Sequence, residues 1–600
     1  MLDKIDLEKL VGYLNNINIE NLYTKKSNGI ELNKLYKIGH VKRNSDKVFL
    51  DSYFDKKHFE IIGETNQLDE GDLVLVKVIF NPRGKIKVKF VQTLETTKQS
   101  LLLYLNNGEL INLKTKSIKE VDDFDCRIYE EFDLFLYTQN KLKYIGNLHD
   151  AKIDDFIALY TYKQEFRLEK YEYTLNKKEE KIDFENRLDL TELDFCTIDP
   201  KTAKDHDDAI YYDMEENILY VAIADVSSYV KEGSNLDKEA YKRSFSSYFP
   251  NKVYPMLPFS LSAGICSLKP NVLRHAFVCK MYFDSNHLVK KSEFIEAVIE
   301  SKNNFAYEYI DELIENNNMP ESLDALLKIT NKLRTKRLKN GFDFRNTEVR
   351  LLLDEDEKLV NFQQEENTVS HHLVEECMLM ANQEAAKKLT QTGIFRVHEE
   401  PDIKKIDALI DRLKDFGLHV KKKANIHATI EQMQKSASNF GIEAQVDKLI
   451  IEAQQQARYS SLKANHFGLG FEHYSHFTSP IRRYSDLILH RILKSGKIPE
   501  NIEQMCEEIS NNEREINYMV WDLEDRKYAR WAQKYIGQTF KAHIADDSDD
   551  PKIELDEVML GLRAKITNYA GQELFSKVNI EFTKSDYISK KIECKIVGTY

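Results

Sequence analysis

The chain has 600 residues, of which 42% are hydrophobic and 31% are charged, and its 86 Lys and Arg against 99 Asp and Glu give a formal net charge of −13. This balance is typical of a folded multi-domain protein and excludes wholesale disorder; no apolar run approaches the roughly 20 residues that cross a bilayer. The acidic charge argues against a surface coated with basic residues for duplex DNA, but it is compatible with a basic cleft or with metal-holding carboxylates.

The beginning of the chain, MLDKIDLEKL, contains acidic residues and lacks the apolar core of a secretory signal. We therefore expect a cytoplasmic protein with no membrane partner. The seven cysteines form no CxxC pair. Buried free thiols in a reducing compartment are favoured over a zinc or dithiol motif.

Residues 1–30 predict a short helical segment, because apolar residues recur near helical spacing at Leu7, Leu10, Val11 and Leu14. From residue 31 to residue 100 the pattern changes to alternating strands, which predict a small OB-type barrel with a hairpin turn at NPRG, residues 81–84.

The strand KIKVKF within this barrel, residues 85–90, is predicted to turn its apolar residues inward and its lysines outward. The inward set is Ile86, Val88 and Phe90, and the outward set is Lys85, Lys87 and Lys89. A basic strand face of this kind can hold single-stranded nucleic acid. The alternative is an ordinary solvated edge strand guarded by lysines.

The rest of the chain divides into three further parts. Residues 101–180 predict a second small β domain, residues 185–530 a large α/β domain, and residues 536–600 a third barrel. The predicted fold class is therefore multi-domain α+β, with small OB-fold β-barrels flanking a large α/β domain.

An acidic cluster lies in the segment LDFCTIDPKTAKDHDDAIYY, where an apolar strand ends at Asp199 and Asp205, Asp207 and Asp208 follow within nine residues. Carboxylates that converge repel one another unless a cation neutralises them. Oxygen-only ligands suit Mg²⁺ or Mn²⁺, which can activate water for phosphodiester hydrolysis. The alternative is a solvated acidic turn.

Read as a whole, TIDPKTAKDHDDAI resembles the metal-binding motif of the ribonuclease II/ribonuclease R (RNB) exoribonuclease family. Four downstream segments resemble family segments in the same order. They are RSFSSYFPNKVYPMLPFSLSAGICSLKP (243–270), HHLVEECMLMANQEAA (371–386), IFRVHEEPD (394–402) and HFGLGFEHYSHFTSPIRRYSDLILHRIL (466–493).

This resemblance implies a processive 3′→5′ hydrolytic exoribonuclease that releases nucleoside 5′-monophosphates from single-stranded RNA with a free 3′ end. It also implies two cold-shock-type OB domains (31–100 and 101–180), an RNB catalytic domain and a C-terminal OB domain of the ribosomal S-one type. A monomer with Mg²⁺, or alternatively Mn²⁺, as cofactor is expected.

The resemblance also assigns roles to individual residues. Asp199, Asp205, Asp207 and Asp208 surround the metal, with Asp207 the most important for turnover, and Arg482 grips the scissile phosphate. The residues expected to contact RNA are Tyr248 and Phe344 by stacking, Glu375 at the terminal ribose, and Arg483, whose alternative role is a structural pair.

The chain departs from the family pattern in three places. An ungapped comparison places Val520 where some members carry a functional glutamate, and the C-terminus VGTY lacks a Lys-rich tail. The family segment RGTSVYFP reads RSFSSYFP here, which keeps the aromatic residue but changes the turn. An RNA-binding scaffold without catalysis and a metal-dependent DNA nuclease or other phosphohydrolase therefore stay open as alternatives.

Overall fold

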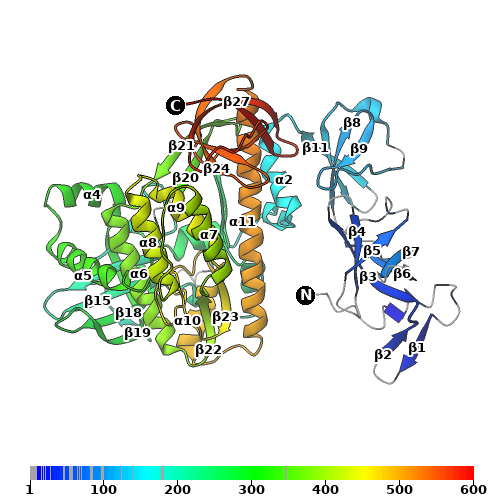
Figure 1. Ribbon diagram of the computed structural model, residues 1–600. Helices are drawn as coiled ribbons and strands as arrows, with labels where there is room; N and C mark the ends of the chain where they lie inside the picture. The colour runs from blue at the N-terminus through cyan, green and yellow to red at the C-terminus, as the bar shows by residue number, and fades with distance from the viewer. Residues whose placement is uncertain are drawn as a thin grey trace. The chain divides into compact units, whose positions relative to one another are not determined.

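The computed structural model describes residues 10–176, 181–344 and 348–600. Within these ranges it leaves out some residues among 12–21 and 64–70, and all of 27–28, 45–46, 53–57, 81–85, 96–99, 123 and 139–140. The chain forms two compact units, Met1–Lys163 and Gln164–Tyr600 (Figure 1). In the described part of the chain, no helix is long and apolar enough to cross a membrane.

The first unit contains a closed five-stranded barrel. Its strands, in spatial order, are β3 (Tyr36–Asn44), β4 (Lys47–Ser52), β5 (His58–Ile62), β7 (Ile86–Glu95) and β6 (Leu73–Phe80). Alternate residues face inward, so that Leu50, Val76 and Val88 are buried in one cluster. All five strands lie within residues 31–100.

The strand predicted to present lysines follows its pattern only in part. Val88 is buried and Phe90 packs against the barrel core, but Ile86, the first residue of β7, is 43% exposed and does not point into the core. Lys87 forms an ion pair with Glu60 at 2.8 Å. Lys85 and the NPRG turn lie outside the described residues.

Residues 10–32 correct the expectation of a purely helical segment. Leu10 and Leu14 are helical and buried beside barrel residues such as Leu75, as the periodicity predicted, whereas Leu7 lies outside the described residues. Strands β1 (Tyr23–Lys26) and β2 (Gly29–Leu32) then pair antiparallel.

The second β region of this unit differs from the expected barrel. Strands β8 (Leu101–Asn106), β9 (Glu109–Asn112), β10 (Asp133–Thr138) and β11 (Lys141–Asn147) form a sheet in the order β11-β10-β8-β9, followed by helix α2 (Asp154–Thr161). An OB barrel has five strands, and these four leave β9 and β11 as open edges in the described residues.

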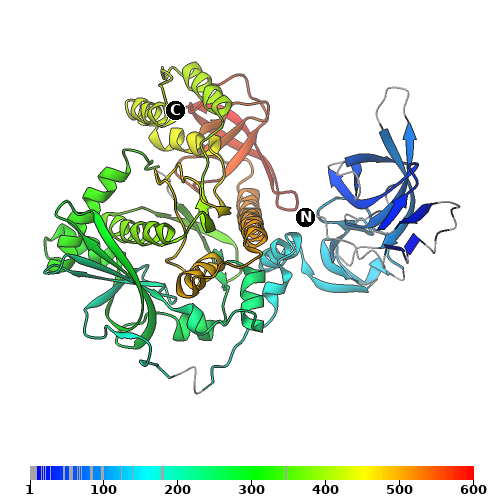
Figure 2. The ribbon, with the colours of Figure 1, turned by 90° about the horizontal axis from the view of Figure 1, so that it is seen from below.

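The second unit is built on a six-stranded mixed sheet. Its order is β12 (Leu188–Asp189), β19 (Val289–Ala306), β13 (Phe195–Asp199), β14 (Asp208–Asp213), β15 (Ile218–Ala224) and β18 (Leu273–Phe283), with β19 also pairing with β18. The long helix α6 (Val369–Lys388) packs against β15 and β18, and Figure 2 shows helix and sheet side by side in green.

The second unit contains further helices and three pairs of strands. The helices are α3 (Asn235–Arg243), α4 (Tyr307–Glu315), α5 (Glu321–Arg337), α7 (Ile403–Asp415), α8 (Ile426–Ser438), α9 (Glu443–Ala453), α10 (Tyr484–Ser495) and α11 (Ile502–Gln533). The paired strands are β16 (Ser247–Phe249) with β17 (Lys252–Tyr254), β20 (Glu348–Leu353) with β21 (Leu359–Glu365), and β22 (Thr392–Val397) with β23 (Arg458–Leu462).

A second closed barrel lies within residues 536–600. Its order is β24 (Thr539–Asp546), β25 (Lys552–Leu555), β26 (Arg563–Ile566), β28 (Lys591–Thr599) and β27 (Lys577–Asp586). Leu574 and Phe575 of this barrel are buried in one apolar cluster with residues of α7, α8 and α9. Helix α11 contacts β27 (Figure 1), so the barrel is fixed to the large domain.

Candidate active site

The four aspartates of the acidic cluster lie at one edge of the six-stranded sheet. Asp199 is the last residue of β13 and Asp208 is the first of β14. These strands run antiparallel, with Cys196 opposite Ile210, so the end of one strand lies beside the start of the other. The connecting loop carries Asp205 and Asp207.

Asp207 is the most deeply placed of these carboxylates, with 4% of its surface exposed. Its Oδ1 accepts a hydrogen bond from the backbone N–H of Ile481 at 2.9 Å. Its Oδ2 is buried without a hydrogen-bond partner among the described residues, 3.8 Å from Nε of Arg482. A buried carboxylate oxygen without a donor is costly unless a cation or ligand satisfies it.

The local electrostatics also indicate a shortage of positive charge. Burial raises the pKa of Asp207 well above its ordinary value, although Arg482 and the N–H of Ile481 oppose the change. Burial and the neighbouring Asp199 raise the pKa of Asp208 to about 7. Burial likewise raises the pKa of Asp205. A cation at this edge would favour the charged form of all three carboxylates.

The carboxylate oxygens therefore fit a hard divalent cation, but their side chains do not converge on one point as the ligands of a bound metal do. In the part of the chain that the structure describes, no group of three or more His, Cys, Asp or Glu side chains is arranged to hold a metal ion. Asp199 Oδ2 lies 2.7 Å from Nδ1 of His206, whose Nε2 lies 2.8 Å from Nδ2 of Asn304. One carboxylate of the cluster is thus engaged by a histidine.

The two arginines of SPIRRYSD have different environments. The Arg482 side chain is 45% exposed and its Nη2 donates to Oγ of Ser479 at 3.2 Å, which leaves much of the guanidinium accessible. Arg483 instead forms a bidentate pair with the buried Asp486, at 2.9 and 2.8 Å, at the start of α10. This pair favours the structural role that the sequence left open for Arg483, and its contact with RNA stays a prediction.

Tyr248 lies on β16 close to the carboxylates. It is 46% exposed, and burial of the remainder together with Asp205 raises its pKa to about 12, while Arg482 opposes the change. An aromatic ring half open to solvent beside a carboxylate group and an arginine is suited to stack on a base.

Phe344 packs among aromatic and apolar side chains. It stacks on Phe342 with ring centroids 5.5 Å apart and packs against the apolar cluster of α7, α8 and α9. The sequence left a core role open for this residue, and its contacts in the described residues are those of a core residue.

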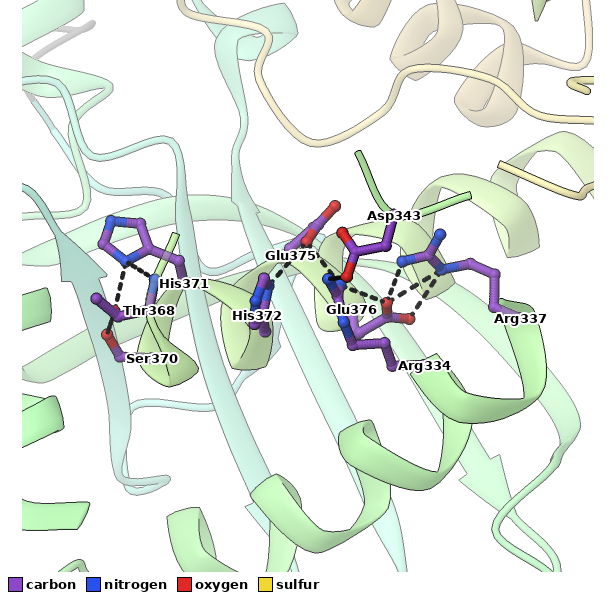
Figure 3. Close-up of polar contacts among 9 residues, drawn as sticks. All are labelled: Arg334, Arg337, Asp343, Thr368, Ser370, His371, His372, Glu375 and Glu376. Carbon is purple, nitrogen blue, oxygen red and sulfur yellow. Dashed lines mark hydrogen bonds and ion pairs between the residues drawn. The ribbon is translucent and has the colours of Figure 1, made fainter. Parts of the chain in front are cut away.

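Glu375 lies on α6 within a network of charged residues (Figure 3). Arg334 of α5 donates to Glu375 at 3.1 Å and to Asp343 at 2.7 Å. Burial raises the pKa of Glu375, but His372 and Arg334 outweigh it, so the net pKa is lowered. The neighbouring Glu376 is buried and pairs with Arg337 at 2.5 Å. Glu375 is therefore a fixed, half-exposed carboxylate.

One further residue, Tyr307, lies close to the cluster without a sequence motif that marks it. Tyr307 directly follows β19, whose last residue, Ala306, is the parallel partner of Asp199. Burial, Asp208 and Asp199 raise the pKa of Tyr307, and its ring stacks on His371 at 3.7 Å. Only the pairing of strands far apart in the sequence places this tyrosine at the cluster.

The comparisons with known proteins agree with this arrangement. A family model described as the RNB domain matches residues 187–497. Ribonuclease R of Helicobacter pylori strain 26695 is 36% identical over 474 residues, 75% of this chain and 73% of that protein. Ribonuclease R of Thermotoga maritima is 34% identical over 395 residues, 61% of this chain and 56% of that protein.

Solved structures share the fold at lower identity. Mycoplasma genitalium RNase R in complex with ribose methylated single-stranded RNA matches with a TM-score of 0.79 at 23% identity, covering 93% of this chain and all of the other (100%). Yeast Ssd1, described as a pseudonuclease, matches with a TM-score of 0.62 at 16% identity, covering 91% of this chain and 80% of the other.

The fold and site thus define a multi-domain α+β protein with an RNB domain at its centre. The chain belongs to the RNB family and is ribonuclease R-like, as its motifs predicted.

Proposed function

We propose that this protein is a processive 3′→5′ exoribonuclease that hydrolyses single-stranded RNA to nucleoside 5′-monophosphates. The observation that carries the proposal is the buried, unsatisfied Oδ2 of Asp207, 3.8 Å from Arg482. Membership of the RNB family and the resemblance to proteins named ribonuclease R support it.

The chain's own residues are given the following roles. The accessible guanidinium of Arg482 binds the scissile phosphate and offsets the negative charge that develops on it. Tyr248 stacks on the terminal base, a contact that tolerates every sequence and so suits stepwise movement along RNA. Glu375, fixed by Arg334, accepts from the terminal ribose hydroxyl.

The proposed cofactor is Mg²⁺, with Mn²⁺ as the alternative, held by Asp199, Asp205, Asp207 and Asp208. When bound, it would supply an activated water and stabilise the leaving oxygen. The support is the oxygen-only donor set and the unsatisfied oxygen of Asp207. The monomeric state and the cytoplasmic location expected from the sequence stay predictions.

Metal binding is expected to be visible without any RNA. Adding MgCl₂ should raise the melting temperature of the protein by several degrees, because a ligand that binds only the folded state stabilises it. Asp208→Asn should remove most of this increase. Asp213→Asn, at the far end of the same strand β14, is the matched control and should keep it. Equal increases in both variants would contradict the proposed ligand set.

Two other functions are separated by one degradation assay. The yeast pseudonuclease shows that this fold also occurs without the nuclease role, which keeps an RNA-binding scaffold as an alternative. An exoribonuclease shortens 5′-labelled single-stranded RNA from its 3′ end and stops when a chelator is added. A scaffold binds the same RNA equally with chelator and never shortens it. A DNA nuclease degrades DNA of the same sequence as readily as RNA.

Ribose recognition by Glu375 predicts a change in substrate preference. Glu375→Ala should reduce the ratio of RNA to DNA degradation by about tenfold, since the lost hydrogen bond is one that only a 2′-hydroxyl can make. The exposed Glu355→Ala serves as the control and should keep the ratio. Parallel rates on RNA and DNA oligonucleotides of one sequence give the measurement. An unchanged ratio would exclude Glu375 from ribose recognition.

A further inference from the structure

The segment leading into the Tyr248 hairpin contains a strained turn. Helix α3 ends at Arg243, and Ser244, which is fully buried, has φ 56° and ψ −39°. The N–H of Phe245 donates to the carbonyl of Arg243 at 2.6 Å, which closes a three-residue γ-turn with Ser244 at its centre. This form of γ-turn is rare and unfavourable for a residue with a side chain, so surrounding contacts must hold it.

Those contacts converge on the serine itself. Nδ2 of Asn512, on helix α11, donates to Oγ of Ser244 at 2.8 Å, and Oγ of Ser244 donates to the carbonyl of Tyr241 at 2.8 Å. The N–H of Tyr484 donates to the carbonyl of Ser244, also at 2.8 Å. Both the side chain and the backbone of the strained residue are therefore anchored, and Asn512 is the anchor that comes from α11.

The turn sets the position of two proposed active-site residues. The N–H of Ser246 donates to the carbonyl of Arg482 at 3.1 Å, and Phe245 forms a β-bridge with Arg483. Tyr248 follows two residues later on β16. Residues 244–246 thus join the segment that carries the arginine to the hairpin that carries the stacking tyrosine.

We propose that Ser244 and Asn512 form a positioning pair, because their hydrogen bond holds the γ-turn so that Arg482 and Tyr248 face the same substrate. This inference rests on the proposed function. Neither side chain contacts RNA or the reacting atoms. A residue with a β-carbon is strained in this backbone conformation, so the Ser244 hydroxyl is needed to accept the hydrogen bond from Asn512 that holds the turn. Glycine adopts the same conformation at no steric cost and needs no anchor.

A double-mutant cycle tests the pair in the full-length protein. Asn512→Ala should lower the single-turnover rate at saturating 5′-labelled RNA by roughly tenfold while the Kd for RNA changes less than about twofold. Ser244→Gly alone should stay within about threefold of the wild-type rate. In the Ser244→Gly background, Asn512→Ala should have almost no further effect.

The neighbouring Asn511→Ala is the matched control, because Asn511 is exposed on the same helix and bonds Arg514 instead. It should leave the rate unchanged. Equal losses from Asn512→Ala in both backgrounds, or a loss in RNA affinity instead of rate, would overturn the positioning role and leave only a packing role. Melting temperatures of all variants show whether each is folded. A folded wild-type protein that leaves RNA intact would instead contradict the proposed function, and the positioning role with it.

Discussion

Asp207→Asn is expected to lower the rate of mononucleotide release from 5′-labelled RNA by about a thousandfold. The amide has the shape of the carboxylate, and its oxygen can still accept the N–H of Ile481 that now reaches Oδ1. What disappears is the negative charge at Oδ2, the buried oxygen without a partner. The loss should therefore fall on catalysis, with the fold retained and RNA affinity changed less than about threefold.

The control for this variant is again Asp213→Asn, the same substitution on the strand that follows the cluster. The Asp213 carboxylate accepts from the backbone of Glu215 and Glu216 in a turn, and an amide oxygen can do the same. Its activity should stay near that of the wild type. An Asp207→Asn protein with full activity would remove Asp207 from the chemistry and with it the assigned site.

Asp225→Asn is expected to have the largest effect on stability, lowering the free energy of unfolding by about 3–5 kcal/mol. Asp225 is fully buried just after β15, and Lys494 of α10 donates to it at 2.6 Å and Arg187 at 2.8 Å. Removing its charge leaves the largely buried Lys494 and Arg187 with the more exposed Glu296 as their ion-pair partner, at 2.8 and 3.2 Å. Chemical denaturation measures the change. The control is Asp324→Asn, which removes an exposed ion pair with Lys328 and should lower the free energy of unfolding by less than about 1 kcal/mol.

The same cluster predicts a pH dependence. Burial raises the pKa of Asp225, but Lys494 and Arg187 outweigh it and hold the pKa well below its ordinary value. Because the pKa of Asp225 is lower in the folded state than the value of about 3.9 in the unfolded state, its carboxylate stabilises the fold above pH 3.9. This stability is lost as the pH falls further. The difference between wild type and Asp225→Asn should therefore be constant at neutral pH and shrink in acid. A difference that grows in acid would contradict this assignment.

The site residues that could be predicted from the sequence are those that lie close together in short motifs. Asp199, Asp205, Asp207 and Asp208 fall within ten residues, so one strand end and one loop gather them at one edge of the sheet. Arg482 comes from a distant segment, and only the family resemblance predicted that it lies near Asp207. The 3.8 Å between Nε of Arg482 and Oδ2 of Asp207 agrees with that prediction.

The features that sequence did not predict depend on long-range pairing. Tyr307 reaches the cluster because β19 pairs with β13 across about a hundred residues of chain, and Phe344 is drawn into the cluster of α7, α8 and α9. The γ-turn at Ser244 exists because α11 supplies Asn512, which follows 268 residues later. Local propensity carries no information about any of these contacts.

Degradation of RNA in water labelled with heavy oxygen tests whether the aspartate cluster and Arg482 direct water at the last phosphodiester of the strand. We expect nucleoside 5′-monophosphates with one heavy oxygen on the phosphate, and a shortened strand that ends in an unlabelled 3′-hydroxyl. Unlabelled nucleotides, nucleoside diphosphates made with inorganic phosphate, or strands that end in a 3′-phosphate would contradict this expectation.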